Sequence, residues 1–330
     1  MIKFGIDLGT ANTVVCDTNQ EIVLDEPSVM LLNPFGDRRQ GVLAAGHDAW
    51  ELVGRSPASV STVRPLQDGV ITDLVTARSY LGALLSRISP PRWPRRRVCA
   101  VLGVPVGATA LERRALLEAA DEAGITRATA LDEPIAGAVG CGIDPLERCA
   151  HLVVDIGGGT AEVTAFCYGG ILAHRSCRVA GDEMSLAVAR HLRQQHQLMV
   201  GELAAEEVKI QASTANEPSL VVQGRDAGTG RPRLATVALD EVNEVVRPVN
   251  ETIIETLSGC LDELPPQATG DVMGKGVLLL GGGSLARGFA EGLERAFGFP
   301  VKLAERPLTC VAEGAAACLH NPVLLTAYAR

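Results

Sequence analysis

The sequence lacks any stretch of 18 uninterrupted apolar residues, which argues against a membrane-spanning helix. Its first residues, MIKFGIDLG, lack the apolar segment of a signal peptide, so we expect no secretory leader. Basic charge is also scarce, because 39 acidic residues outnumber 30 basic ones and give a net charge of −9. Since duplex nucleic acids are bound through basic surfaces, this balance argues against a nucleic-acid-binding protein.

Cysteine pairs with metal-binding spacing are absent as well. The nine cysteines form no CxxC motif, their number is odd, and several lie within apolar segments. We therefore expect buried, reduced thiols rather than disulfides or a zinc site, as is typical of a cytosolic protein. The 330 residues, 47% hydrophobic and 21% charged, suffice for two globular lobes with sizeable cores.

A glycine-rich hairpin in the middle of the chain is the most informative feature that is present. His151 to Val163 reads HLVVDIGGGTAEV, an apolar strand that ends in Asp155 and is followed by three glycines and Thr160. Glycines have no Cβ, so their backbone N–H groups can approach a bulky anion closely. Asp155 offers only acceptor oxygens and suits a hydrated Mg²⁺ beside phosphates. Taken alone, the motif could equally be an ordinary glycine-rich turn.

The same pattern occurs near the N-terminus, where Phe4 to Val15 reads FGIDLGTANTVV. Each copy is an apolar strand, an aspartate, a turn of small residues and a returning strand. Alignment on the aspartates makes three positions correspond: Asp7 with Asp155, Gly9 with Gly157, and Asn12 with Thr160. A repeated phosphate-binding hairpin predicts two similar half-molecules that face each other across a cleft.

Alternating strand and helix patterns indicate an α/β protein. Residues 98–104 read as a buried strand, and Thr109 to Glu112 form a capping box that opens a helix ending near Gly124. A short strand at 128–131 then places Glu133 at its carboxyl end, where ligands bind in such sheets.

Later segments supply further candidate ligand contacts. Gly181 and Asp182 begin a helix, where they either bind sugar hydroxyls or cap the helix, and the cap is the commoner outcome. Glu206 and Lys209 are three residues apart on one helical face, so they could share a ligand or form a surface ion pair.

The C-terminal third contains a third glycine-rich turn. We expect two helical segments within residues 239–264, closed by Pro265-Pro266. After a buried strand, residues 281–284 (GGGS) should begin a helix that reaches Phe297 and ends at Gly298, with free N–H groups directed at a ligand.

Residues 89–97, SPPRWPRRR, combine prolines with aromatic and basic side chains. The segment is either a solvated basic loop or a contact with anionic lipid, because tryptophan prefers the headgroup level and arginines are attracted to the surface. The candidate membrane-contact residues are Arg92, Trp93, Arg95, Arg96 and Arg97.

Six strings in this order resemble the MreB family of bacterial actin homologues, within the superfamily of actin, DnaK-type chaperones and sugar kinases. They are DLGTANTVV, LDEPSV, VRPLQDGVI, VVDIGGGTAEV, RVAGDEM and LLLGGGSLARG, and the resemblance extends from Met1 to about Leu319. It implies a two-lobed actin-like (ribonuclease-H-like) ATPase fold, with duplicated mixed sheets flanked by helices and four subdomains. Lobe I would comprise residues 1–140, with an insertion at 33–68 and a C-terminal return at 320–330. Lobe II would comprise 141–320, with an insertion at 180–244.

The resemblance also implies roles for individual residues around ATP and Mg²⁺. The phosphates would be held by Thr10, Ala11 and Asn12 from one lobe and by Gly158, Gly159 and Thr160 from the other. Asp7 and Asp155 would lie near the metal through water. The nucleoside would be contacted by Gly181, Asp182, Glu206, Lys209, Gly282, Gly283 and Ser284. Glu133 would orient or deprotonate the attacking water, assisted by Thr160.

In function, the resemblance implies a slow ATPase that polymerises on the inner face of the cytoplasmic membrane. Such filaments would organise cell shape together with the cell-wall elongation machinery, from a cytoplasmic, peripherally membrane-associated location. The alternatives are a non-polymerising ATP-binding scaffold or regulatory paralogue, and a sugar or acid kinase. A DnaK-type chaperone would need a substrate domain and lid, for which no residues remain after the two lobes.

Overall fold

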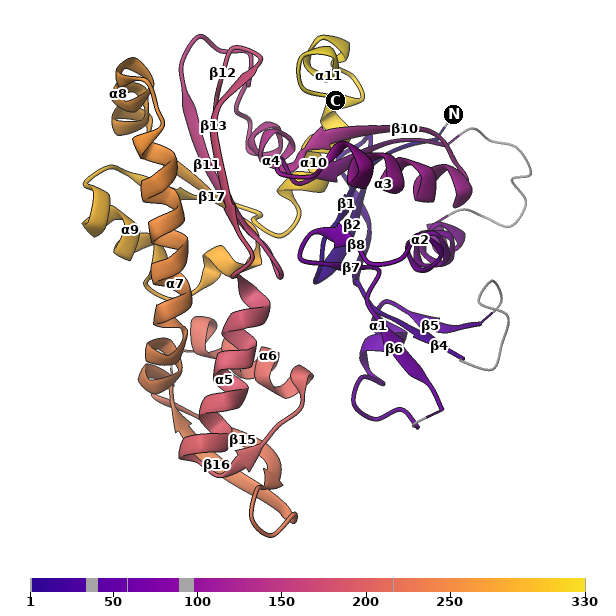
Figure 1. Ribbon diagram of the computed structural model, residues 1–330, viewed down its shortest axis with the longest axis vertical. Helices are drawn as coiled ribbons and strands as arrows, with labels where there is room; N and C mark the ends of the chain where they lie inside the picture. The colour runs from indigo at the N-terminus through magenta and orange to yellow at the C-terminus, as the bar shows by residue number, and fades with distance from the viewer. Residues whose placement is uncertain (1, 34–40, 58, 89–97, 216, 330) are drawn as a thin grey trace.

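The computed structural model describes residues 2–33, 41–57, 59–88, 98–215 and 217–329. Two five-stranded sheets form the centres of two lobes (Figure 1). The first sheet has the order β10-β9-β1-β2-β3, with bounds Ile125–Asp132, Val98–Val104, Ile2–Leu8, Asn12–Asp17 and Ile22–Pro27. The second has the order β13-β12-β11-β17-β18, with bounds Gly170–Cys177, Ala161–Cys167, His151–Ile156, Val277–Leu280 and Val301–Leu303.

The two sheets have the same strand directions. β1 pairs antiparallel with β2 and parallel with β9, and β11 pairs antiparallel with β12 and parallel with β17. The apolar strands β9 and β17 are largely buried, as expected where helices cover both faces of a sheet. The repeat predicted from the two hairpins is therefore a duplication of the whole sheet, and the predicted α/β class with duplicated mixed sheets is confirmed.

Helices α2 (Leu74–Ile88) and α3 (Ala110–Glu122) pack on the first sheet, where Tyr80 and Leu84 join the core of β1. The predicted capping box is present, since Thr109 Oγ1 accepts from the Glu112 N–H at 3.3 Å and Glu112 Oε2 accepts from the Thr109 N–H at 2.6 Å. A small sheet of β4 (Met30–Leu32), β5 (Val42–Ala45) and β6 (Ser61–Val63), with α1 (His47–Trp50), extends from this lobe, and β7 (Leu66–Gln67) and β8 (Val70–Ile71) lead back from it.

The second lobe carries α5 (Gly181–Gln195), α6 (Glu202–Thr214) and a sheet of β14 (Leu198–Met199), β15 (Ser219–Asp226) and β16 (Pro232–Ala238). The prediction of two helices within 239–264 is wrong, because α7 (Leu239–Asp262) runs unbroken through Pro248. One face of α7 is buried in the core along its length, and the residues of this face include Val242, Val246, Ile253 and Leu257. The free energy gained by burying this face outweighs the loss of one backbone hydrogen bond at the proline.

Two boundaries near the C-terminus also differ from expectation. Pro266 begins a separate helix, α8 (Pro266–Lys275), because proline suits the first helical position. The third glycine turn forms a 3₁₀ turn, η1 (Gly282–Leu285), and α9 (Phe289–Phe297) starts only after Gly288, whose φ of +74° interrupts the helix. The predicted closure at Gly298 is confirmed, with φ +73°.

Two helices of small residues, α4 (Glu133–Gly140) and α10 (Cys310–Cys318), lie between the sheets (Figure 1). They cross at very close range, since a Cβ at Gly314 would overlap the carbonyl oxygen of Ala136. Gly5 of β1 similarly allows close contact with the backbone of α10. α11 (Pro322–Tyr328) follows, with Tyr328 buried in the same apolar cluster as Phe166.

All nine cysteines are free thiols, and five of them are buried. Within the part of the chain that the structure describes, no helix has both the length and the apolar character needed to cross a membrane.

The α4–α10 crossing yields a stability prediction. Gly314→Ala should lower the free energy of unfolding by about 3 kcal/mol, the upper end of typical overpacking costs, because helix backbone rather than a movable side chain opposes the added methyl group. Gly292→Ala in α9 is the matched control, since nothing lies within 4 Å of its Cβ, and it should raise stability by about 0.5–1 kcal/mol. Urea unfolding of both variants measures the difference, and equal stabilities would contradict the close crossing.

Candidate functional site

The two glycine-containing turns have the same backbone geometry. In the first, the Gly9 N–H donates to the Asn12 carbonyl at 3.0 Å, and in the second the Gly157 N–H donates to the Thr160 carbonyl at 2.9 Å. These are the positions that the sequence repeat aligned. Each turn lies at the carboxyl end of a central strand, where ligands bind in α/β proteins.

The turns of the two lobes contact each other directly. A Cβ added at Gly158 would lie 2.8 Å from the Ala11 Cβ, and one at Gly159 would lie 3.1 Å from Thr10 Cγ2 and 2.9 Å from the Asp68 Cα. Only glycine leaves enough space for this approach. The predicted phosphate-binding residues of both lobes are therefore brought together at one place.

Thr10 is held by residues that sequence reasoning did not single out. Its Oγ1 accepts from the Gly69 N–H at 3.0 Å, and its carbonyl accepts from Arg64 at 3.2 Å. Arg64 also forms an ion pair with Glu202 at the start of α6, so it connects the two lobes. Arg64 lies in the string VRPLQDGVI, but nothing in that string indicates a partner 138 residues away.

Three carboxylates from different elements lie close enough for the charge of one to affect the pKa values of the others. Asp7 is near the end of β1, Asp155 is near the end of β11, and Glu133 begins α4. Burial raises the pKa of Asp7 to about 7. Burial, and then the negative charge of Asp7, raise the pKa of Asp155 to about 8. The pKa of Glu133 is raised well above its ordinary value, first by burial and then by Asp7.

The donor set fits a hydrated Mg²⁺. Carboxylate oxygens are hard ligands, and Mg²⁺ keeps several water molecules while binding one or two carboxylates and phosphates. The negative charge of Asp7, which adds to burial in raising the pKa values of Asp155 and Glu133, is balanced when a cation lies between the groups. Asp7 and Asp155, both only half-buried, are therefore suited to hold the metal through water.

Glu162 on β12 is a fourth carboxylate at this site, and the sequence reasoning missed it. It is 3% exposed, accepts from the Val106 N–H at 3.1 Å, and lies 3.4 Å from His174 Nε2. Directly opposite Asp155 in the strand register, it also raises the pKa of Asp155 and Glu133. The sequence repeat could have indicated this residue, because the second hairpin has a glutamate where the first has the apolar Val14, opposite Asp7.

The start of α5 is attached to the second turn. The Gly181 N–H donates to the Gly157 carbonyl at 3.1 Å, and the Asp182 N–H donates to the Gly158 carbonyl at 2.8 Å. Of the two alternatives for Gly181 and Asp182, the helix cap is wrong, because Ala180 is the N-cap residue and its N–H donates to Glu183 Oε2 at 3.1 Å. Burial raises the pKa of Asp182, while Arg64 and then Lys209 act against it.

Glu206 and Lys209 lie beside this helix start rather than on an isolated surface. Their side chains pair at 2.6 Å, and Lys209 Nζ donates to the Gly181 carbonyl at 3.0 Å. Ser185 Oγ donates to Glu206 Oε2 at 2.5 Å. The structure thus brings Gly181, Asp182, Glu206 and Lys209 together next to the second turn.

The third turn completes the group. Gly281 has φ +76°, and a Cβ there would lie 2.5 Å from Asp155 Oδ1, so this turn lies against the Asp155 side chain. Ser284 is buried, and its hydroxyl donates to the Gly281 carbonyl at 2.6 Å. A Cβ at Gly283 would overlap Ile156, so this glycine packs on the end of β11.

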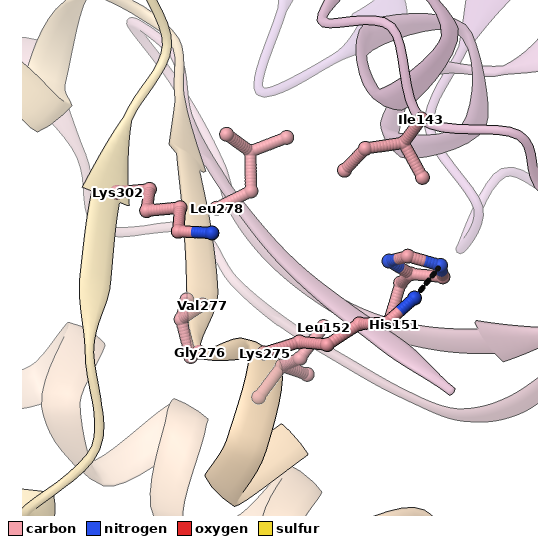
Figure 2. A pocket seen from close by; sticks show the side chains of 8 residues that line it. All are labelled: Ile143, His151, Leu152, Lys275, Gly276, Val277, Leu278 and Lys302. Carbon is pink, nitrogen blue, oxygen red and sulfur yellow. Dashed lines mark hydrogen bonds between the residues drawn. The ribbon is translucent and has the colours of Figure 1, made fainter. Parts of the chain in front are cut away.

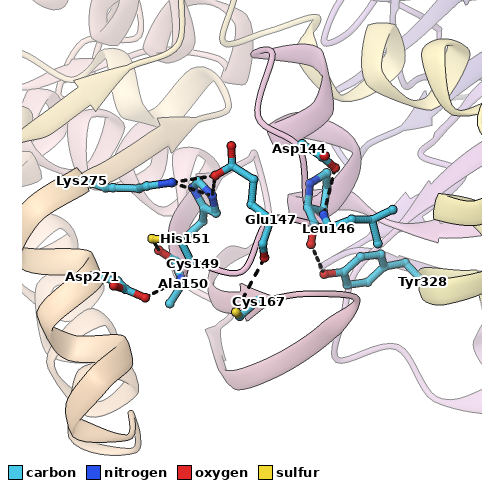
Figure 3. A network of polar contacts seen from close by, with 11 residues as sticks. Asp144, Leu146, Glu147, Cys149, Ala150, His151, Cys167, Asp271, Lys275 and Tyr328 are labelled. Carbon is cyan, nitrogen blue, oxygen red and sulfur yellow. Dashed lines mark hydrogen bonds and ion pairs between the residues drawn. The ribbon is translucent and has the colours of Figure 1, made fainter.

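A separate pocket of about 320 Å³ lies at the other end of β11 (Figure 2), where His151 and Lys275 are among the lining residues. Next to it, Lys275 Nζ pairs with Glu147 at 2.7 Å, and Glu147 also contacts His151 Nε2 at 3.1 Å (Figure 3). None of the predicted site residues lines this pocket. The predicted membrane-contact residues Arg92, Trp93, Arg95, Arg96 and Arg97 lie outside the described residues.

Comparisons with known proteins give a consistent family match. The chain matches the family model described as MreB/Mbl protein over residues 1–326. It is 36% identical over 322 residues to the cell shape-determining protein MreB of Escherichia coli K12, covering 96% of this chain and 92% of that protein. It is 35% identical over 325 residues to the cell shape-determining protein Mbl of Bacillus cereus, covering 96% and 95%.

Solved structures give the same result. MreB5 of Spiroplasma citri bound to AMPPNP superposes with a TM-score of 0.88 at 31% identity, covering 96% of this chain and 95% of that one. A MamK double helical filament superposes with a TM-score of 0.81 at 25% identity, covering 97% and 99%. With an actin-like fold and a match to the family model along nearly its whole length, the chain belongs to the MreB/Mbl family.

Proposed function

We propose that this protein binds ATP with Mg²⁺ between its two lobes, hydrolyses it slowly, and assembles into filaments. The observation that carries the proposal is the contact between two equivalent glycine turns, beside three carboxylates with raised pKa values. The Spiroplasma citri relative bound to AMPPNP, and the same relative bound to ADP, support nucleotide binding.

In this proposal each lobe holds the phosphates with one turn. Thr10, Ala11 and Asn12 contribute from the first turn, and Gly158, Gly159 and Thr160 from the second. Backbone N–H groups near small residues bind phosphate oxygens without a large entropic cost, because the turns are already ordered. The nucleoside would lie along Gly181, Asp182, Glu206, Lys209, Gly282, Gly283 and Ser284.

Hydrolysis would depend on positioning and charge neutralisation. Mg²⁺, held through water by Asp7 and Asp155, would neutralise charge on the phosphates. Glu133 would accept a proton from the attacking water, since a carboxylate with a raised pKa is the stronger base once ionised. Thr160 would assist by orienting that water.

Filament formation follows from translational stacking of identical subunits, a contact that does not close on itself. The MamK double helical filament supports self-association in this fold, and the cell shape-determining relatives support a role in cell shape. The filament would lie on the inner face of the cytoplasmic membrane, through Trp93 and its neighbouring arginines, and would act with the cell-wall elongation machinery. A non-polymerising scaffold or regulatory paralogue is the alternative.

Removing the proposed base should separate binding from hydrolysis. Glu133→Gln should keep ATP affinity but lower the rate of phosphate release by about 10²–10⁴-fold, the usual contribution of a general base. Glu118→Gln, which alters an exposed glutamate of α3, is the matched control and should change neither quantity. Calorimetry and a phosphate-release assay provide the two readouts. Unchanged release in Glu133→Gln would remove this residue from the mechanism.

The carboxyl group of Asp155 should also make metal-free stability pH-dependent. Because the pKa of Asp155 rises from 3.8 to about 8 on folding, the folded state binds more protons than the unfolded state between these values. The free energy of unfolding in EDTA should therefore fall as pH rises from 6 to 8, and Asp155→Asn should make this fall less steep, leaving the contributions of Asp7 and Glu133. Asp121→Asn, at an exposed position, should retain it. A slope in Asp155→Asn equal to that of the parent chain would show that Asp155 does not contribute to the titration.

Assembly and membrane binding can be tested together by electron microscopy on a monolayer of anionic lipid. With ATP, the protein should form paired straight filaments on the lipid. Trp93→Ala should reduce filament coverage and co-sedimentation with anionic liposomes, because it removes the aromatic side chain suited to the headgroup level. Trp50→Ala, in α1, is the control for loss of a tryptophan. Dispersed particles would favour the scaffold alternative, and unchanged liposome binding would favour a solvated loop.

A further inference from the structure

Two histidines and a glutamate meet at the far end of α5 from the glycine turns. His191 lies near the C-terminal end of α5, His196 follows the helix as its C-cap residue, and Glu241 lies in the first turn of α7. Their ligand atoms all lie within 4.8 Å of one another. His196 Nε2 is 2.8 Å from Glu241 Oε1, and His191 Nε2 is 3.6 Å from Glu241 Oε2.

One ring nitrogen of His191 has no hydrogen-bond partner in this arrangement. Its Nε2 is inaccessible to solvent and has no hydrogen-bond partner, although a carboxylate oxygen faces it at 3.6 Å. A buried polar atom without a partner is costly, and native structures rarely keep one without a reason. A cation placed between this nitrogen and the carboxylate would make both of them ligands.

The three side chains are held on a rigid scaffold. Val188 and Leu192 of α5, and Val242 of α7, are buried in the second lobe's core on either side of the cluster. The carboxylate is oriented because Glu241 Oε1 also accepts from the Ala238 N–H at 3.0 Å. Such fixing of a ligand by an outer hydrogen bond is typical of metal sites.

We propose that His191, His196 and Glu241 form a binding site for a divalent transition metal of the zinc type. Two imidazole nitrogens and one carboxylate oxygen are a common zinc ligand set, with water in the fourth position, whereas Mg²⁺ prefers oxygen ligands alone. Tetrahedral ligands at zinc distances are about 3.3 Å apart, and the two histidine–carboxylate distances, 2.8 Å to Oε1 and 3.6 Å to Oε2, lie on either side of that value. The metal would join the end of α5 to the start of α7.

The site is independent of the nucleotide chemistry proposed above. His191 and His196 belong to the helix that begins at Gly181, but at its opposite end. The three side chains are each 20–31% exposed, which leaves a path for a metal ion from solvent. Sequence spacing does not indicate the site, because Glu241 is 45 residues from His196.

The test uses the full-length chain, stripped with EDTA and titrated with Co²⁺ and with Zn²⁺. We expect one tight site, with a tetrahedral Co²⁺ absorption spectrum that lacks the sulfur-to-cobalt charge-transfer band of cysteine ligands. The double variant His191→Gln/His196→Gln should bind at least about tenfold more weakly. The matched control, His47→Gln/His320→Gln, removes two exposed imidazoles elsewhere and should bind like the parent chain.

Thermal unfolding is the second measurement, and it distinguishes loss of the metal site from loss of folding in the ligand variants. Zn²⁺ should raise the Tm of the parent chain and of the control in a concentration-dependent manner, because it binds the folded state. The ligand variants should unfold cooperatively with no such rise, and Glu241→Gln should behave as they do. Equal Co²⁺ affinity in the parent and the double variant, a sulfur charge-transfer band, or absence of binding to the parent would each overturn the proposal.

Discussion

The structure depends on a steric constraint, namely that two backbone turns from different lobes can touch only where side chains are missing. Gly158 and Gly159 allow contact with Ala11 and Thr10, and any larger residue there would force the lobes apart. Near this contact, the negative charge of Asp7 helps to raise the pKa of Asp155, a repulsion that a cation would relieve. The packing of the turns and the charges beside them are therefore linked, because both depend on how closely the two lobes approach each other.

The two halves of the molecule have diverged in chemistry while keeping one architecture. Their central sheets have matching strand directions, and their turns are closed by equivalent hydrogen bonds. Glu162 nevertheless occupies the place that Val14 has in the other half. Glu133, the first residue of α4, belongs to only one of the two halves. The carboxylates that could act on water are therefore distributed unequally around a nearly symmetric frame.

Local signals explain which parts of the structure could be predicted from sequence. The hairpins, the Thr109 capping box and the stop at Gly298 depend on residues within a few positions of one another. Proline and glycine were less informative where burial over many turns decides the outcome, as in α7, which continues through Pro248. Arg64 and the histidine cluster escaped notice because their partners are 138 and 45 residues away, and only the fold brings them together.

The geometry of α5 has a mechanical consequence. With 15 residues, the helix is about 22 Å long, and it is tied to the second turn at Gly181 by backbone hydrogen bonds. A tilt of about 5° at that attachment would displace the other end by about 2 Å. The helix is thus a lever arm, through which a small rotation at the second turn would become a movement of about 2 Å at the end of α5 that leads to β14.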